Sequence, residues 1–159
     1  ITYTEALKLL NEKCDMKVEW GKDLRTIEEE KLMELFDTPI IVIDYPKEVM
    51  AFYKPERSPT PENVPGPVAK CFDMLAPEGF GEIVGGSERE TDAKRLVEEL
   101  KKEGEDPATY DWYIDLRKYG SVPHSGYGLG VERVVKWICG LESIKDVIPF
   151  PRTMERFTP

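Results

Sequence analysis

The chain has 159 residues, of which 40% are hydrophobic and 33% charged, and its formal net charge is −9 at pH 7. This length suffices for one domain with a hydrophobic core. No apolar run approaches the ~20 residues of a membrane span and no secretory signal pattern opens the chain, so we predict a soluble, cytoplasmic protein without membrane contacts. The acidic balance argues against a general nucleic-acid-binding module, which would carry a basic face.

The first third of the chain predicts two short helices and a pair of strands. Thr4 can cap one helix and Thr26 a second, each followed by apolar residues at helical spacing. The apolar run 40–43 is typical of a buried strand, and residues 49–53 are predicted as its partner. Residues 54–67 contain five prolines, which predicts a surface loop.

Two more strands, over 68–75 and 82–89, are predicted around a turn at 76–79. Three helices follow: one from Ala93 that Gly104 stops, one that Asp106-Pro107 begins and that ends before Gly120, and one after the glycine-rich segment 126–130. Because strands occur in adjacent pairs and helices in runs, we predict an α+β fold with an antiparallel sheet flanked by helices.

The three cysteines, Cys14, Cys71 and Cys139, are far apart in the sequence and form no C-x-x-C pair. This spacing is more typical of reduced, buried thiols than of disulfides or metal ligands. We therefore expect no disulfide and no cysteine-bound metal.

Two carboxylates on neighbouring predicted strands form a candidate metal site. Glu82 follows Gly81 and, with Asp73 on the preceding strand, could face a common cavity. Such a pair suits Mg²⁺, a hard ion that keeps waters and bridges phosphate oxygens. The alternative is that both are exposed sheet carboxylates without a ligand.

Arg89 is a candidate for recognising a planar polar group through its fork of donors. It lies seven residues after Glu82, an odd number that places the two side chains on opposite faces of a regular strand. A bulge at the glycine pair 85–86 would bring both into one cavity. The alternative is a surface ion pair between Arg89 and Glu88 or Glu90.

Arg133 is the third residue of the helix after the segment Gly126-Tyr-Gly-Leu-Gly130. A helix start offers free N–H groups and a positive dipole end, which both suit phosphate. Gly128 and Gly130 would let a flat ring or another chain pack on the backbone, although many glycine-rich turns serve only close packing.

His124 is the only histidine of the chain. A Ser-His-Asp triad would need a nucleophile elbow, and no G-x-S-x-G motif occurs. We therefore interpret His124 as a turn residue or a support for the site, and not as a general base.

These segments resemble the class II aminoacyl-tRNA synthetases of the aspartate, lysine and asparagine subgroup, and within it the asparaginyl-tRNA synthetases of archaeal or bacterial type. The resemblance covers nearly the whole chain. The segments that carry it are residues 44–53, 72–79, 81–90 and 112–126, the third class II motif at 128–133, and residues 148–153. It implies the antiparallel-sheet catalytic domain of that class. One departure is Glu88, where the family usually has Gln.

The resemblance also implies roles in an ATP site. Glu82 and Asp73 would hold the Mg²⁺ that bridges the ATP phosphates. Arg133 would reach the γ-phosphate and lie along the adenine ring, next to Gly128 and Gly130. Glu82 and Arg133 are therefore the expected catalytic residues, and ATP and Mg²⁺ the expected cofactors.

On the amino-acid side, the resemblance implies that Arg89 grips the side-chain oxygen of asparagine, beside Gly126. The asparagine carboxylate would attack the α-phosphate of ATP to give asparaginyl-adenylate and pyrophosphate. Transfer of the asparaginyl group to tRNA(Asn) would follow.

The same resemblance implies that residues 1–159 are the C-terminal portion of such a catalytic domain. The chain begins with Ile1, and the first two class II motifs and the anticodon-binding domain have no counterpart in it. We therefore expect the chain alone to be inactive and the full-length enzyme to be a homodimer.

Two other functions stay open at this point. One is the same part of an aspartate–tRNA ligase, in which Arg89 would pair with a carboxylate. The other is a paralogue, such as a tRNA-independent asparagine synthetase or a non-catalytic interaction module. Residues 81–87 and 121–125 favour the asparagine type over the aspartate type.

Overall fold

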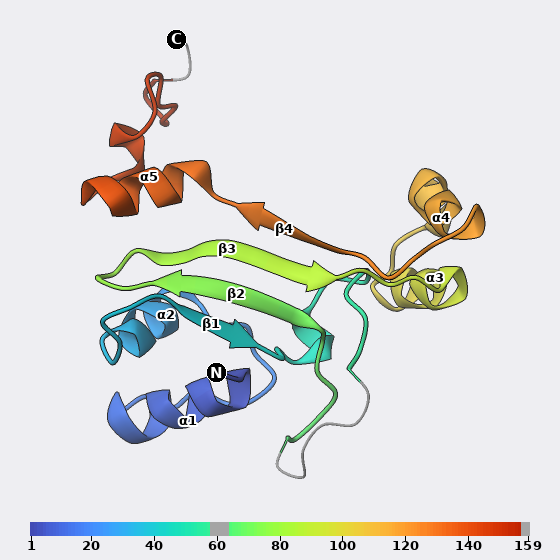
Figure 1. Ribbon diagram of the computed structural model, residues 1–159, viewed down its shortest axis with the longest axis horizontal. Coiled ribbons are helices and arrows are strands. Elements are labelled where there is room, and N and C mark those ends of the chain that lie inside the picture. Colours follow the sequence, from blue (N-terminus) through green and yellow to red (C-terminus); the bar gives the residue numbers. More distant parts are fainter. Residues whose placement is uncertain (58–63, 157–159) are drawn as a thin grey trace.

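A four-stranded antiparallel sheet with the strand order β1-β2-β3-β4 organises the chain (Figure 1). The computed structural model describes residues 1–57 and 64–156. The strands are β1 (Ile40–Ile43), β2 (Cys71–Ala76), β3 (Gly81–Glu88) and β4 (Ser125–Leu129). The predicted α+β fold with an antiparallel sheet flanked by helices is confirmed.

The predicted hairpin is confirmed as β2 and β3, which are joined by a turn at residues 77–80. Glu78 and Gly79 both have positive φ there, at 61° and 78°. Because glycine adopts this conformation without steric cost, Gly79 favours the turn. The hairpin supplies the centre of the sheet.

The predicted strand at 49–53 is wrong. Residues Lys47–Val49 form a 3₁₀ helix, η1, and the amides of Val49 and Met50 bond to the carbonyls of Pro46 and Lys47. Local turns thus use the donors that a strand would need, and β1 pairs with β2 instead. Of the predicted loop 54–67, residues 58–63 lie outside the described residues.

β4 was not predicted as a strand, because its glycines are unfavourable in strands. It forms on the edge of β3, with Gly128 opposite Gly85 and Gly126 opposite Ser87. The glycine-rich segment thus belongs to the sheet and not to a loop.

The predicted bulge exists at a different position. Met74 pairs with Val84, whereas Leu75 pairs with Glu82, so Ile83 is the extra residue of β3. The bulge therefore precedes the glycine pair 85–86. Like the predicted one, it resets the alternation of side chains between Glu82 and Arg89.

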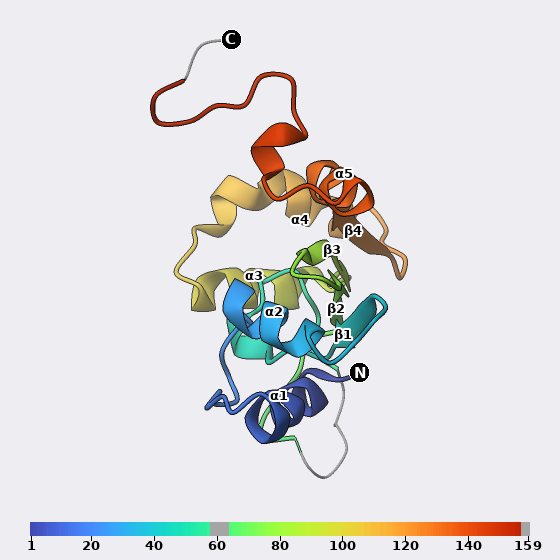
Figure 2. The same cartoon turned by 90° about the vertical axis from the view of Figure 1, so that its left-hand side faces the viewer.

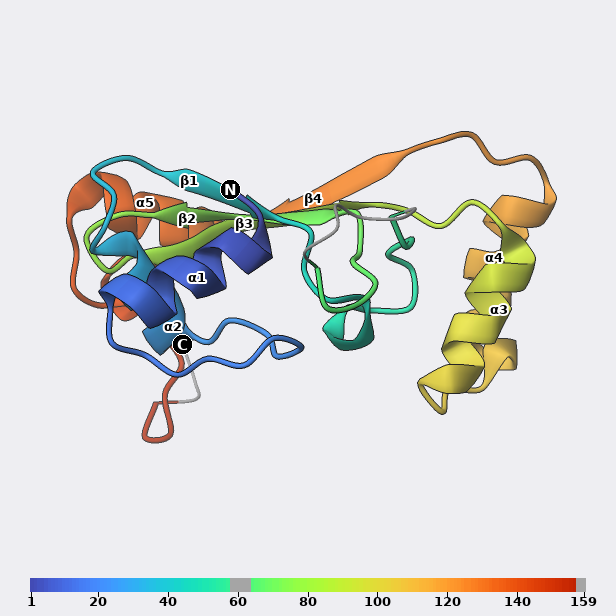
Figure 3. The same cartoon turned by 90° about the horizontal axis from the view of Figure 1, so that it is seen from below.

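Helices α1 (Tyr3–Lys13) and α2 (Thr26–Met33) cover one face of the sheet at β1, β2 and β3 (Figure 3). Thr2 caps α1, with Glu5 completing a capping box, so the predicted cap at Thr4 is wrong by two residues. Arg25, not Thr26, precedes α2. The large buried side chains of this core are Tyr3, Leu10, Leu32, Val42, Tyr45 and Leu75.

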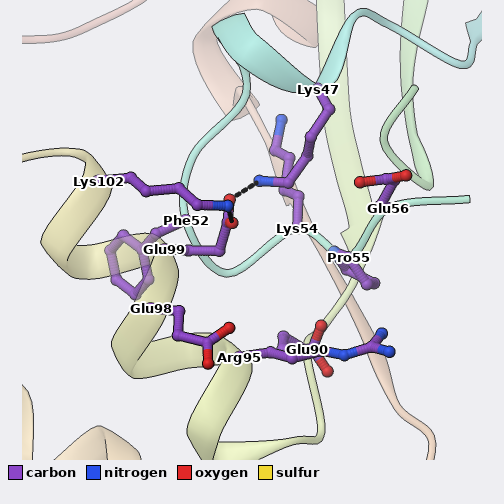
Figure 4. A pocket seen from close by; sticks show the side chains of 10 residues that line it. All are labelled: Lys47, Phe52, Lys54, Pro55, Glu56, Glu90, Arg95, Glu98, Glu99 and Lys102. Carbon is purple, nitrogen blue, oxygen red and sulfur yellow. Dashed lines mark hydrogen bonds and ion pairs between the residues drawn. The ribbon is translucent and has the colours of Figure 1, made fainter. Parts of the chain in front are cut away.

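A second, smaller core lies beyond the other end of the sheet. It joins α3 (Ala93–Lys102), the 3₁₀ helix η2 (Pro107–Tyr110) and α4 (Asp111–Lys118) through Leu96, Leu100 and Ile114. Asp106 caps η2 with Pro107 at its first position, as predicted, although α-helical geometry begins only at Asp111. An ion pair between Lys47 and Glu99, 2.8 Å long, ties η1 to α3 (Figure 4).

After β4 the chain forms α5 (Val131–Cys139) and the 3₁₀ helix η3 (Ile144–Asp146). Val131 and Ile138 of α5 are 62% and 75% exposed. Cys139 is also exposed, whereas Cys71 is buried and Cys14 half-buried, and all three thiols are free. The prediction of buried thiols is therefore wrong for Cys139.

The two faces of the sheet differ in cover. Helices α1 to α4 lie on the same side (Figure 2). On the opposite face the side chains of Ile41, Tyr127 and Leu129 are exposed. Within residues 1–57 and 64–156, no helix is both long and apolar enough to cross a membrane.

Candidate functional site

The candidate site residues gather on the helix-covered face of the sheet, above positions without side chains. Gly85 pairs with Asp73 on one side and with Gly128 on the other, and Gly126 lies two residues from Gly128. Side chains two apart on a strand, or directly opposite on its neighbour, share a face. Val42 pairs with Asp73 and is buried against α1 and α2, which identifies the face.

The carboxylates of Glu82 and Asp73 converge above Gly85. A β-carbon placed on Gly85 would lie 2.7 Å from Glu82 Oε1 and 3.1 Å from Asp73 Oδ1. Burial raises the pKa of Asp73 to about 6, and the neighbouring charge of Glu82 adds to the rise. Two close carboxylates repel each other unless a cation lies between them. The predicted pairing of these two residues is therefore present in the structure.

The number of ligating side chains fits one kind of metal better than others. Among the described residues, no group of three or more histidine, cysteine, aspartate or glutamate side chains could hold a metal ion. Two carboxylates are enough for Mg²⁺, which retains waters and takes its other ligands from substrate phosphates. The pair is unsuited to zinc, which takes three or four protein ligands.

Glu29 on α2 is a third carboxylate at this place, and the sequence analysis missed it. Its Oε2 accepts a hydrogen bond of 3.3 Å from the Glu82 amide. Burial raises the pKa of Glu29 to about 7, with the charges of Glu82 and Asp73 adding to the rise. The run of three glutamates at 28–30 is typical of a solvated helix face, so no sequence signal distinguishes the middle one.

Tyr45 is a buried residue next to the same carboxylates. Its side chain is fully buried, and burial followed by the charge of Asp73 raises the pKa of its hydroxyl. The hydroxyl therefore stays protonated beside the carboxylates at any physiological pH.

Arg133 lies at the edge of the carboxylate pair, in the first turn of α5 as predicted. Its Nη1 donates 2.6 Å to the Glu82 carbonyl and 3.3 Å to Glu82 Oε2, and its side chain is half exposed. Gly130 makes room for it, because a β-carbon on Gly130 would lie 3.2 Å from Arg133 Cδ. A cavity of about 420 Å³ lined by Glu29, Glu82 and Arg133 opens here.

Arg89 lies just after β3, with its guanidinium on the same face. A β-carbon on Gly126 would lie 2.9 Å from Arg89 Nη2. The Arg89 amide donates 2.9 Å to the His124 carbonyl, and Nη1 donates to Ser87 Oγ. The guanidinium carbon lies 4.8 Å from the ring centre of Tyr53. His124 thus supports the site through its main chain, in agreement with its interpretation as a turn residue.

The surface ion pair considered for Arg89 does not form. Glu88 pairs with Lys70 at 2.8 Å, and Glu90 accepts the amides of Thr91 and Asp92. Within the described part of the chain, Arg89 has no carboxylate partner. Its charge is therefore available to a ligand.

The acidic and basic ends of the site are close enough for one small molecule to span them. The carboxylate pair lies over Gly85 and the Arg89 guanidinium over Gly126, which is opposite Ser87. Two residues along a strand and one strand across separate these positions by about 8 Å. Gly128 is a neighbour of both positions, opposite Gly85 and two residues from Gly126, and a β-carbon there would contact nothing within 4 Å.

A second hollow, of about 400 Å³, lies between η1 and α3 (Figure 4). Its lining mixes cations with glutamates, and two of the cations, Lys47 and Lys102, pair with Glu99. These charges largely compensate one another, so the hollow does not present one charge to a ligand.

The comparisons with known proteins identify the family to which the chain is similar. The family model described as tRNA synthetases class II (D, K and N) matches residues 1–154. The chain is 51% identical to the asparagine–tRNA ligase of Pyrococcus abyssi and 50% identical to that of Pyrococcus furiosus. Both matches cover the whole chain but only 35% of the relative.

Solved structures give the same result. An asparaginyl-tRNA synthetase from Pyrococcus horikoshii, complexed with asparaginyl-adenylate, matches with a TM-score of 0.90 and 51% identity over 99% of this chain and 35% of that chain. An aspartyl-tRNA synthetase from Entamoeba histolytica matches with a TM-score of 0.88 and 30% identity, over 100% of this chain and 32% of that chain.

The raised pKa values predict that the chain without ligands loses stability as the pH rises from 5 to 8. The pKa values of Glu29 and Asp73, about 7 and about 6, exceed the value of about 4 in an unfolded chain. Between pH 4 and pH 7 the folded state therefore binds more protons than the unfolded state, so the free energy of unfolding decreases as the pH rises. Above pH 7 this stabilising contribution is lost. Urea unfolding at pH 5, 6, 7 and 8 measures this change in the free energy of unfolding.

Two variants of α2 provide the control. Glu29→Gln should make the free energy of unfolding less dependent on pH, whereas Glu30→Gln, on the exposed side of α2, should leave this dependence unchanged. A wild-type stability that increases with pH over this range would contradict the assignment.

Proposed function

The chain belongs to the family of class II tRNA synthetases for aspartate, lysine and asparagine, and we propose that it is the C-terminal portion of the catalytic domain of an asparagine–tRNA ligase. The observation that carries the proposal is the guanidinium of Arg89, without an ion-pair partner in the described chain, on the same glycine-lined face as the Asp73–Glu82 pair. The 51% identity to an asparagine–tRNA ligase over the whole chain supports asparagine as the amino acid.

The proposed reaction has two steps. A carboxylate oxygen of asparagine attacks the α-phosphorus of ATP, the bond to the β-phosphate breaks, and pyrophosphate leaves. A hydroxyl of the terminal adenosine of tRNA(Asn) then attacks the carbonyl carbon of asparaginyl-adenylate, and AMP leaves. Both steps depend on positioning and on neutralising charge, so no acid–base pair is required.

The ATP side of the site is assigned to Glu82, Asp73 and Arg133. Glu82 and Asp73 would hold Mg²⁺, which when bound supplies positive charge to the phosphate oxygens. Arg133 already neutralises part of the Glu82 charge, and its exposed donors can reach a γ-phosphate or lie along adenine. Gly128 leaves the backbone open to a flat ring, and Gly130 makes room for the Arg133 side chain beside it.

The amino-acid side is assigned to Arg89 and Gly126. The fork of Arg89 can donate to the side-chain oxygen of the amino acid, and Gly126 keeps the space above β4 open. A guanidinium binds the carboxylate of aspartate at least as well as the amide of asparagine. This charge favours an aspartate–tRNA ligase as the second candidate, and the 30% identity to an aspartyl enzyme ranks it below the first.

The relatives are almost three times as long as this chain, which spans 35% of them. We therefore assign tRNA(Asn) binding, homodimer formation and cytoplasmic activity to the full-length protein that carries this chain. The 159 residues alone are expected to be inactive, because they hold only one part of the ATP site.

The amino-acid specificity can be measured by ATP–pyrophosphate exchange. The full-length protein should exchange with asparagine and charge tRNA(Asn), and aspartate should support exchange at least about 100-fold less efficiently. The chain alone should show no exchange. Faster exchange with aspartate would contradict the proposal. Exchange with aspartate that yields asparagine when ammonia is added, without tRNA charging, would instead identify the paralogue, a tRNA-independent asparagine synthetase.

Substitution of Arg89 separates the two sides of the site. In the full-length protein, Arg89→Ala should raise the KM for asparagine about 10- to 100-fold, because charge-assisted hydrogen bonds are lost. The KM for ATP should change less than about threefold, within ordinary variation. Arg95→Ala, which removes an exposed arginine of α3, is the matched control and should change neither KM. A larger effect of Arg89→Ala on ATP than on asparagine would refute the assigned role.

A further inference from the structure

Arg117 on α4 is a buried cation that the proposed chemistry does not use. Its side chain is only 7% exposed. The guanidinium makes three hydrogen bonds: Nε to the Glu90 carbonyl at 2.9 Å, Nη1 to the Tyr113 carbonyl at 3.1 Å, and Nη2 to the Tyr113 hydroxyl at 2.8 Å. It also lies over the Tyr113 ring at 3.9 Å. All its acceptors are neutral, and none of the described carboxylates forms an ion pair with it.

A buried charge is costly unless hydrogen bonds or an ion pair compensate for its lost hydration. The two hydrogen bonds to Tyr113 stay within α4, so they connect this helix to no other part of the chain. The informative contact is the one to Glu90, since it crosses from α4 to the segment that leaves β3. A hydrogen bond from a buried charged donor is stronger than one from a neutral donor. It therefore fixes the carbonyl of Glu90, the residue that directly follows Arg89.

The amide of the same residue, Glu90, is also fixed. The Glu90 amide donates 2.8 Å to the Tyr53 carbonyl, and the Tyr53 ring lies under the Arg89 guanidinium. The Arg89 amide is held by the His124 carbonyl. Arg117 thus supplies the α4 contact in a set of bonds that surrounds the backbone of Arg89.

We propose that Arg117 is a positioning residue for amino-acid recognition, and that it acts by clamping the Glu90 carbonyl so that the Arg89 guanidinium stays over Gly126. This inference rests on the proposed function for its substrate, and on the hydrogen bonds alone for its mechanism. It assigns α4, which contributes no side chain to the cavity, to the binding of the amino acid.

The first test compares kinetic constants in the full-length protein. Arg117→Met keeps an unbranched, apolar side chain of similar length in this buried position, but it removes every hydrogen bond. We expect its KM for asparagine to rise about 10-fold or more, because small displacements of a binding group have large effects. The KM for ATP should change less than about twofold. Arg117→Lys, which can still reach one carbonyl, should restore part of the loss.

Arg95→Met is the matched control. Arg95 is an exposed arginine near the start of α3 (Figure 4), and the same substitution there should leave both constants unchanged. An unchanged asparagine KM in a folded Arg117→Met protein would overturn the proposal. An equal rise of both KM values would also overturn it, because this would indicate general loss of structure.

A double substitution tests whether Arg117 acts through Arg89. If it does, Arg117→Met in an Arg89→Ala background should add less than about a twofold change in the KM for asparagine, since residues that act as a unit are not additive. A full, multiplicative effect of the two substitutions would contradict the mechanism.

Amide hydrogen exchange tests the clamp without reference to any activity. Arg117→Met should speed exchange at residues 89–92 about 10-fold or more relative to the wild type, while α1 and α2 stay protected. Unchanged exchange at 89–92 would overturn the clamp even if the protein activates asparagine. If the wild-type full-length protein does not activate asparagine but Arg117→Met still speeds exchange at 89–92, the clamp is supported and the proposed function is refuted. If Arg117→Met does not fold, Arg117→Gln, which is too short to keep the bond to the Glu90 carbonyl, takes its place, and the same outcomes apply to it.

Discussion

The site depends on glycines, which leave room for charged side chains directly above the backbone. Four charged side chains lie against three glycines: the Asp73–Glu82 pair over Gly85, Arg89 over Gly126, and Arg133 against Gly130. A β-carbon at any of these glycines would come within 3.2 Å of the charged side chain above it. Any residue with a side chain would therefore displace a functional group. The glycines lower the intrinsic stability of β3 and β4, and the space they leave is what allows opposite charges to occupy one face of a sheet.

The bulge at Ile83 and the two cores act on this face together. Without the extra residue, Glu82 would point to the opposite face from Asp73, and the carboxylates would not meet. The core under α1 and α2 partly buries Asp73 and Glu29, and this burial raises their pKa values. A cation at the acidic end would lower the cost of their ionisation. The core of α3 and α4 holds the chain that presents Arg89. Each end of the site thus belongs to a different core, and the sheet fixes the distance between them.

Much of this could be predicted from local sequence signals. The β2–β3 hairpin, the helix after Asp106-Pro107 and the charged residues among glycines all follow from turn, capping and spacing rules. Strand 49–53 was mistaken because η1 uses its amides locally, and β4 was missed because its glycines serve the site and not the strand. Glu29 and Arg117 could not be found, because their importance comes from contacts across 53 and 27 residues of sequence. No local periodicity records such contacts.

The central claim is that one glycine-lined face binds the amino acid at Arg89 and the phosphates at the Asp73–Glu82 end. A crystal structure of the full-length protein with a non-hydrolysable asparaginyl-adenylate analogue would test it directly. The account predicts the side-chain amide oxygen within hydrogen-bond distance of the Arg89 guanidinium and the phosphate toward Glu82, with the ligand lying over Gly128. An analogue bound in the reverse orientation, or outside this face, would contradict it.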